Sequence, residues 1–320
     1  MMFRFWAAMA VVGVLAGCGG GAPFGNPVDP VDPTDPTDPV DPLAVPEDIA
    51  KNLRSITYDP TGGGKLKVNL EGLTASAQTA TFVRNTALDI EGYRAFTYQE
   101  TGLQRTHLAL VSDGLRGTVR TGAVADGGQF NQHYGGGTYS RIDMYRAPVV
   151  REGVESGQFS YAGTYAGVFL PGEATHPTLP PGLTPYKPYR VKGDTLINAN
   201  FANDLVNGGV ENRWLLDDSG ARIDLNADGV VDDNDKLTAI VFRANAIDDN
   251  GMFLGDVEFL GAPDSAIGNY GGMFGGVGAT DIGGAIVINP IPGNRGIWEY
   301  GVFNLPRCDL AGASPLCVPR

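Results

Sequence analysis

The chain has 320 residues, 46 of them glycine, and its 36 acidic side chains against 23 basic ones give a formal net charge of −13. So acidic a surface excludes nucleic acid as a partner, because phosphate backbones are bound through clustered lysine and arginine. Beyond residue 46, about 270 residues remain, enough to bury a sizeable core in one large or two modest domains.

The first eighteen residues predict export. Arg4 precedes an uncharged apolar run at 6–16, which ends in Leu15-Ala16-Gly17-Cys18. The run is shorter than the roughly 20 residues of a membrane-spanning helix and has the length of a signal-peptide core. Its end resembles the lipobox of bacterial lipoproteins. That resemblance implies a signal peptide at 1–17 and acyl chains such as palmitate on Cys18. The alternative is an ordinary secretory signal with an incidental cysteine.

Residues 18–46 predict a stalk. Glycines follow Cys18, and proline then occupies every third position from 27 to 42, mostly beside aspartate. Proline fixes φ and removes backbone donors, so this stretch is expected to form an extended polyproline spacer of roughly 50 Å. A proline-rich recognition motif is the alternative, although no basic residue accompanies the prolines.

The rest of the chain predicts an all-β fold. Alternating segments separated by glycine clusters, at 127–128 and 135–137 among others, indicate short strands joined by tight turns. The predicted strands are 65–70, 94–99, 106–111, 117–124, 138–144, 158–170, 195–201, 210–216, 237–244, 253–260, 270–274 and 285–288. Parts of 46–54 and 201–206 are short helix candidates, and 171–188 is expected to be a surface loop. Strands this short and close predict a sandwich or an up-and-down barrel.

One acidic segment, 224–235, predicts a calcium site. Oxygen-bearing side chains occupy loop positions 1, 3, 5, 9 and 12, glycine occupies position 6, and position 7 can supply a backbone carbonyl. Calcium binds six to eight hard oxygen ligands, which this pattern can provide. These ligands are Asp224, Asn226, Asp228, Val230, Asp232 and Asp235. The segment resembles the calcium loop of dockerin repeats, with aspartate where the EF-hand has glutamate. No second repeat follows, so the resemblance concerns the loop alone. The alternative is a solvated acidic turn.

Two cysteines near the end of the chain, Cys308 and Cys317, predict a disulfide. In an exported protein a lone close pair is typical of a disulfide, and closing so small a loop contributes about 2–3 kcal/mol in the chain-entropy model. Metal binding by the pair is the less favoured alternative, because no histidine lies near either thiol.

A wider resemblance covers residues 157–289. The segment 272–285 (GMFGGVGATDIGGA) resembles the closing strand pair of the lipoprotein barrels of transferrin-binding protein B and factor-H-binding protein, with Asp281 where those have glutamate. Segments 163–167 and 255–259 resemble the opening and penultimate strands. The resemblance implies a small β-rich handle at 47–150 followed by an eight-stranded antiparallel barrel within 151–320. It transfers no binding residue, because partners bind variable loops in that family.

No catalytic constellation is present in the sequence. His107, His133 and His176 lie in separate segments, and no nucleophile elbow, phosphate loop or HExxH motif occurs. The chain is therefore expected not to be an enzyme. We expect a lipid-anchored outer-membrane protein, exposed on the cell surface, that binds an extracellular protein or a small nutrient ligand and carries a structural calcium. The alternatives are an envelope structural protein without a specific ligand and a calcium-dependent hydrolase.

Overall fold

The fold is all-β, as the sequence predicts. A computed structural model describes residues 41, 43–59, 64–72, 77–99, 102, 105–128, 132–150, 157–172, 179–288 and 297–317. Within these residues the only helices are α1 (Glu47–Ala50) and two single 3-10 turns, η1 (Thr86–Leu88) and η2 (Asp233–Asp235). No helix in this described part has the length and apolar character needed to span a bilayer.

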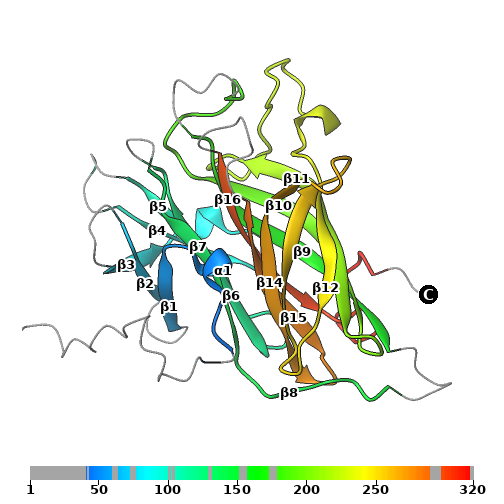
Figure 1. Cartoon of the computed structure of the whole chain (residues 1–320). Coiled ribbons are helices and arrows are strands. Elements are labelled where there is room, and N and C mark those ends of the chain that lie inside the picture. The colour runs from blue at the N-terminus through cyan, green and yellow to red at the C-terminus, as the bar shows by residue number, and fades with distance from the viewer. Residues whose placement is uncertain are drawn as a thin grey trace, which may run out of the picture. The chain divides into compact units, whose positions relative to one another are not determined.

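Strands β1 to β7 form one antiparallel sheet in which each strand pairs with the next along the sequence (Figure 1). Neighbours in the sheet are also neighbours in the sequence, so the topology is a simple meander. The strands are β1 (Leu53–Asp59), β2 (Lys65–Leu70), β3 (Gln78–Arg84), β4 (Arg94–Tyr98), β5 (His107–Ser112), β6 (Val119–Asp126) and β7 (Gly135–Arg141).

Strands β9 to β16 form a closed eight-stranded antiparallel barrel, which confirms the predicted architecture. It closes because β13 pairs with β14 and the last strand, β16, pairs with the first, β9. The strands are β9 (Gln158–Leu170), β10 (Tyr189–Asn200), β11 (Leu205–Leu216), β12 (Ile240–Ala246), β13 (Met252–Phe259), β14 (Ala266–Val277), β15 (Asp281–Ile288) and β16 (Trp298–Pro306). A two-residue strand, β8 (Tyr145–Arg146), pairs in parallel with β14.

Four details of the predicted order are wrong. Segment 272–285 supplies β14 and β15, the sixth and seventh barrel strands, and β16 follows them as the eighth. Segment 255–259 lies in the fifth strand rather than the penultimate one. Residues 201–206 form a turn and the start of β11 instead of a helix, because the barrel pairs Asn200 with Leu205 across that turn. The glycine cluster at 135–137 lies inside β7.

The inner face of the barrel is filled by large apolar side chains. The largest of them are Tyr161, Tyr165, Phe242, Tyr270, Phe274 and Phe303, all fully buried. Glycines on the neighbouring strands make room for these rings. A Cβ at Gly301 would lie 1.8 Å from the hydroxyl oxygen of Tyr165. The barrel interior is therefore a packed core.

One ion pair lies within this core. Arg213 and Glu299 are each 2% exposed, and Arg213 Nη2 donates to Glu299 Oε2. Tyr165 donates to Glu299 Oε1 at 2.6 Å, and Arg213 Nη1 also donates to the carbonyl of Thr238. Burial, together with the nearby Glu299 carboxylate, raises the pKa of Tyr165, so the phenol remains a proton donor.

The seven-stranded sheet packs against the outer face of β9, β14, β15 and β16. Tyr93 joins the two layers, because its hydroxyl donates to the carbonyl of Thr164 at 2.8 Å and accepts from the amide of Asn304 at 2.9 Å. The hydroxyl of Thr118 donates to Asp281 at 2.9 Å, and burial raises the pKa of Asp281. The apolar residues between the layers include Ile49, Leu108, Leu110, Val119, Tyr139, Val168, Met273, Val287, Tyr300 and Val302.

Residues Pro42–Arg320 form one compact unit, and of the other unit, Met1–Asp41, only Asp41 is described. The predicted signal peptide, the predicted acylation site Cys18 and the predicted stalk up to residue 40 therefore lie outside the described residues, as does His176. The predicted domain boundary at residue 150 stays a prediction.

Candidate binding surface and calcium loop

The predicted calcium loop lies in the connection between β11 and β12. Two residues with positive φ, Ala227 (58°) and Gly229 (89°), turn the chain there. Asp224 Oδ2 accepts from the amide of Gly229 at 2.8 Å, and Asp228 Oδ1 accepts from the amide of Val230 at 2.9 Å. The carboxylates of Asp224 and Asp228 thus accept hydrogen bonds from the backbone of the loop itself. The other oxygen of Asp224, Oδ1, is buried and accepts no hydrogen bond.

The last position of the loop, Asp235, is buried and joins its two ends. Its carboxylate accepts from the amides of Leu225 at 2.8 Å, Asn226 at 3.2 Å and Asp232 at 2.9 Å. These amides, that of Asp232 foremost, lower the pKa of Asp235 and keep it charged. Asp232 in turn caps η2, accepting from the amide of Asn234 at 2.8 Å.

The ligand set is not assembled around one centre. Among the described residues, no three histidine, cysteine, aspartate or glutamate side chains converge as a metal site. The chemistry still fits a hard cation, because the loop combines carboxylates, an amide oxygen and the buried Oδ1 of Asp224. Calcium binding therefore remains a prediction.

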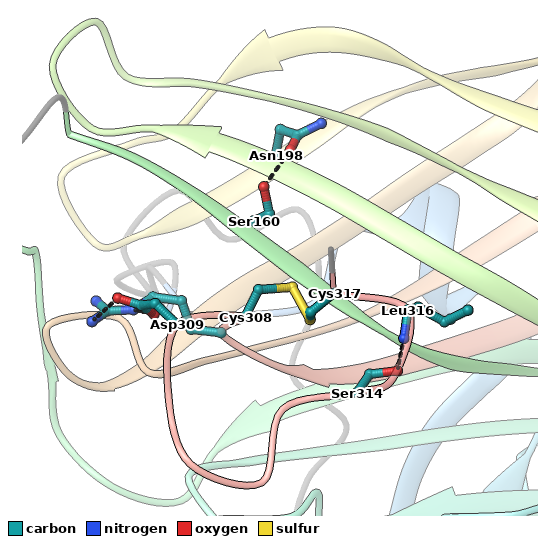
Figure 2. Close-up of a disulfide and its surroundings, with 8 residues drawn as sticks. Ser160, Asn198, Cys308, Asp309, Ser314, Leu316 and Cys317 are labelled. Carbon is teal, nitrogen blue, oxygen red and sulfur yellow. Dashed lines mark hydrogen bonds and ion pairs between the residues drawn. A yellow bond between two sulfur atoms is a disulfide. The ribbon is translucent and has the colours of Figure 1, made fainter. Parts of the chain in front are cut away.

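The predicted disulfide between Cys308 and Cys317 is present. Figure 2 shows it beside Ser160 of β9, whose carbonyl accepts from the amide of Cys308 at 2.8 Å. The disulfide therefore holds the tail that follows β16 against the first barrel strand. The hydroxyl of Ser160 donates to Asn198 Oδ1 of β10 at 2.7 Å.

Of the described histidines, His107 lies in β5 and His133 lies between β6 and β7. His107 of β5 packs edge-on against Phe82 and next to Tyr98, and burial lowers the pKa of its imidazole. It pairs in register with Asp126, whose buried carboxylate is held by Arg105 and by the amide of Tyr134 at 3.0 Å. These contacts are structural, and the expectation that the chain is not an enzyme stays a prediction.

The outer face of β10, β11, β12 and β13, here called the open wall, remains exposed. Along β10, exposed Leu196 and Asn198 alternate with buried Thr195, Ile197 and Ala199. The strands thus present one face to the packed core and the other to solvent. Leu205 and Leu254 are further exposed apolar residues on this wall.

Three grooves lie along the open wall. Two of them, here called the amide grooves, have volumes of about 260 and 300 Å³ and share Asn198 and Asn207. Further polar residues lining them are Gln158, Asn200, Asn203 and Glu211. Gly209 lines the smaller amide groove and has no side chain to fill it. The amide nitrogen of Asn198 points away from Ser160 in Figure 2, so it is available to a ligand.

The third groove, here called the tryptophan groove, has a volume of about 310 Å³. Trp214 lies in it, and the Arg222 guanidinium stacks over the indole with its Cζ 4.1 Å from the ring centroid. The remaining charged and amide residues lining the groove are Lys192, Asp194, Asn212, Asp233 and Lys236.

Sequence reasoning missed all three grooves. The alternation of amides with apolar residues at 197–200 was a usable signal, because it places Asn198 and Asn200 on the outer face of a strand. The position of Asn207 opposite Asn198 depends on the pairing register of β10 and β11, which the sequence does not display.

Comparison with solved structures finds similar chains at low identity. A transferrin-binding protein B double mutant from Haemophilus parasuis Hp5 is 11% identical with a TM-score of 0.38, covering 78% of this chain and 52% of that chain. Transferrin-binding protein B from serogroup B Neisseria meningitidis is 14% identical with a TM-score of 0.31, covering 79% and 51%. The crystal structure of a surface lipoprotein is 14% identical with a TM-score of 0.33, covering 79% and 96%.

This chain spans about half the length of those two transferrin-binding proteins. No protein-family model matches the sequence, and no curated protein is similar to it. At these identities and TM-scores, the likeness establishes neither a family nor a ligand for this chain.

Proposed function

We propose that this chain is a lipid-anchored binding protein that captures its ligand on the open wall of the barrel. The proposal rests on the difference between the covered and the exposed parts of the barrel surface. Aromatic side chains fill the interior, and the seven-stranded sheet covers the outer face of β9, β14, β15 and β16. The open wall is the face left to solvent, and it bears three adjoining grooves.

The N-terminal segments complete the proposal. Acyl chains on Cys18 hold the protein in the outer membrane, and the proline-rich stalk separates the barrel from the lipid by tens of ångströms. So long a spacer serves a domain that meets a partner outside its own membrane. The partner is an extracellular protein or a small nutrient ligand, and ligand capture requires the open wall to face the outside of the cell.

A single engineered thiol tests this orientation. Asn207→Cys adds a free cysteine to the open wall. It is the one thiol expected to react, because Cys308 and Cys317 are joined to each other and Cys18 is acylated in the proposed protein. We expect a membrane-impermeant maleimide to label this variant on intact cells as fully as on permeabilised cells.

Ala285→Cys is the matched control for this experiment. Its side chain is fully buried between the barrel and the sheet, so it is expected to react only after denaturation. Labelling of Asn207→Cys that appears only after the outer membrane is permeabilised would contradict surface exposure and favour a periplasmic structural protein.

A second proposal concerns the loop 224–235: one calcium ion orders the connection between β11 and β12. The buried, unpartnered Asp224 Oδ1 supports it, because a carboxylate oxygen withdrawn from water without a donor needs a cation or a hydrogen bond. Asp224, Asn226 and Asp228 would supply side-chain oxygens and Val230 its carbonyl, with Asp232 and Asp235 completing the set. The metal would have a structural role.

Removing calcium is expected to destabilise the full-length protein. At a calcium concentration about 100-fold above Kd, the metal should raise the melting temperature by about 5 °C relative to excess chelator. Asp224→Ala should abolish that difference. Asp249→Ala removes an exposed aspartate outside the loop and should preserve it. Identical wild-type melting curves with calcium and with chelator would refute the site.

A further inference from the structure

We propose that the tryptophan groove binds a carboxylate carried by an extended saccharide that lies along the open wall. The inference rests on the proposed binding function and deepens it by naming the ligand class. In this groove three cationic side chains face two acidic ones, although the protein as a whole has a net charge of −13.

Arg222 is the cation that is free to bind a ligand. Its side chain is exposed and stacks on Trp214, and no carboxylate of the described residues lies within ion-pair distance of its guanidinium. Stacking fixes the plane of the guanidinium and leaves its N–H edge open. Such an edge matches the two oxygens of a carboxylate, so binding needs little further ordering of the side chain.

The two acids of the groove are already engaged. Asp194 Oδ2 accepts from Asn212 Nδ2 at 2.9 Å, and Asn212 Oδ1 accepts from Lys236 Nζ at 3.1 Å. Lys236 also pairs with Asp233 at 2.9 Å. These contacts form one network along the groove. The two carboxylates hold neighbouring side chains in place, and these partners reduce their repulsion of an incoming anion.

Lys192 is the second cation available to a ligand. Its Nζ lies 3.4 Å from Glu91, whose carboxylate is largely exposed. Exposed ion pairs of this kind contribute little to stability, so a ligand carboxylate can replace Glu91 at small cost.

A β-bulge shapes the groove. The register between β10 and β11 shifts between Lys192 and Asp194, and Asn212 takes a φ of 48° there. The shift sends Arg213 inward to Glu299 while Asn212 and Trp214 line the groove outside. Bulges that redirect side chains in this way are frequent beside functional sites.

The amide grooves continue the tryptophan groove along the same strands. From Lys192 to Asn200, β10 extends for about 26 Å at roughly 3.3 Å per residue. Side-chain amides offer a donor and an acceptor together, which suits the hydroxyl groups of a saccharide. A peptide is less suited, because β10 and β11 are both paired on each side and leave no edge for an added strand.

A matched pair of hexasaccharides tests the inference with the purified full-length protein in detergent and calcium. The probes are β-1,4-linked mannuronate hexasaccharide, which carries a carboxylate on each sugar, and β-1,4-mannohexaose, which carries a neutral hydroxymethyl group in its place. By isothermal titration calorimetry we expect the acidic probe to bind about tenfold more tightly, the effect of a charge-assisted hydrogen bond. Arg222→Gln should remove this preference, and Lys192→Gln should reduce it.

Arg243→Gln is the control, since it removes one positive charge from the same wall at a residue paired with Asp264 outside the tryptophan groove. It should leave the preference within about twofold of wild type because of screening. Equal affinity for the two probes, or binding of neither, would overturn the inference. Equal affinity with measurable binding would leave the open wall as a binding surface, whereas failed surface labelling of Asn207→Cys overturns the proposed function separately.

Discussion

Replacement of Glu299 by glutamine is expected to lower the free energy of unfolding by about 3–5 kcal/mol, the usual cost of leaving one member of a buried ion pair without its partner. Glu299 is the carboxylate partner of Arg213, whose side chain lies within the packed barrel core, and it also accepts from Tyr165. The Nε of Arg213 already has no hydrogen-bond partner, and the neutral carbonyl of Thr238 that accepts from Nη1 cannot balance the charge of the guanidinium. Urea denaturation of the full-length protein measures the change.

The double variant Arg213→Met/Glu299→Leu separates the unpaired charge from the loss of packing. Apolar pairs of similar volume often replace a buried ion pair at little cost. The double variant should therefore be more stable than Glu299→Gln alone. A loss below about 1 kcal/mol for Glu299→Gln would show that water reaches Arg213 in the barrel.

Gly136→Ala is expected to destabilise the protein by about 3 kcal/mol, at the upper end of the cost of overpacking. A Cβ at Gly136 would lie 1.9 Å from the carbonyl oxygen of Ala50 and 2.8 Å from the Cβ of Leu53. Both contacts involve α1 or the chain just after it, so the backbone itself would have to move.

The control for this substitution is Gly72→Ala, where a Cβ would have no neighbour within 4 Å. It should change the free energy of unfolding by less than about 0.5 kcal/mol. Thermal unfolding of both variants compares the two sites directly. Similar stability of Gly136→Ala and wild type would mean that α1 is not held against β7.

The strands that alternate strongly could be predicted from the sequence. Segments 65–70 and 158–170 coincide with β2 and β9, because each places apolar residues on one face and polar or small ones on the other. Strand β16 was missed. Its inward position 299 holds a glutamate, and the charge breaks the pattern unless Arg213, far away in the sequence, is known to face it.

The glycines at 135–137 show why local signals fail at a packed interface. Three consecutive glycines are typical of a turn, yet they begin β7. A Cβ at Gly135 would meet Tyr300, one at Gly136 would meet Ala50, and one at Gly137 would meet Ala285. Their purpose is close approach between the sheet, α1 and the barrel, which becomes visible only in three dimensions.

The candidate site could be predicted only where it is local. The loop 224–235 was found because its residues are consecutive, and the disulfide because its cysteines are near each other. The stacking of Arg222 on Trp214 depends on the turn after β11, where Leu216 forms a bridge with Arg222. No periodicity in the sequence predicts this turn, which brings Arg222 back beside β11.

The closure of the barrel has a consequence for the order in which the protein folds during synthesis. Strand β9 must pair with β16, which is synthesised more than a hundred residues later. Until then the strand edge of β9 that β16 will cover is unpaired and open to pairing with other chains. Synthesis of this protein therefore passes through an aggregation-prone intermediate, and the yield of folded protein should depend on chaperones that cover the open edge of β9 until β16 is complete.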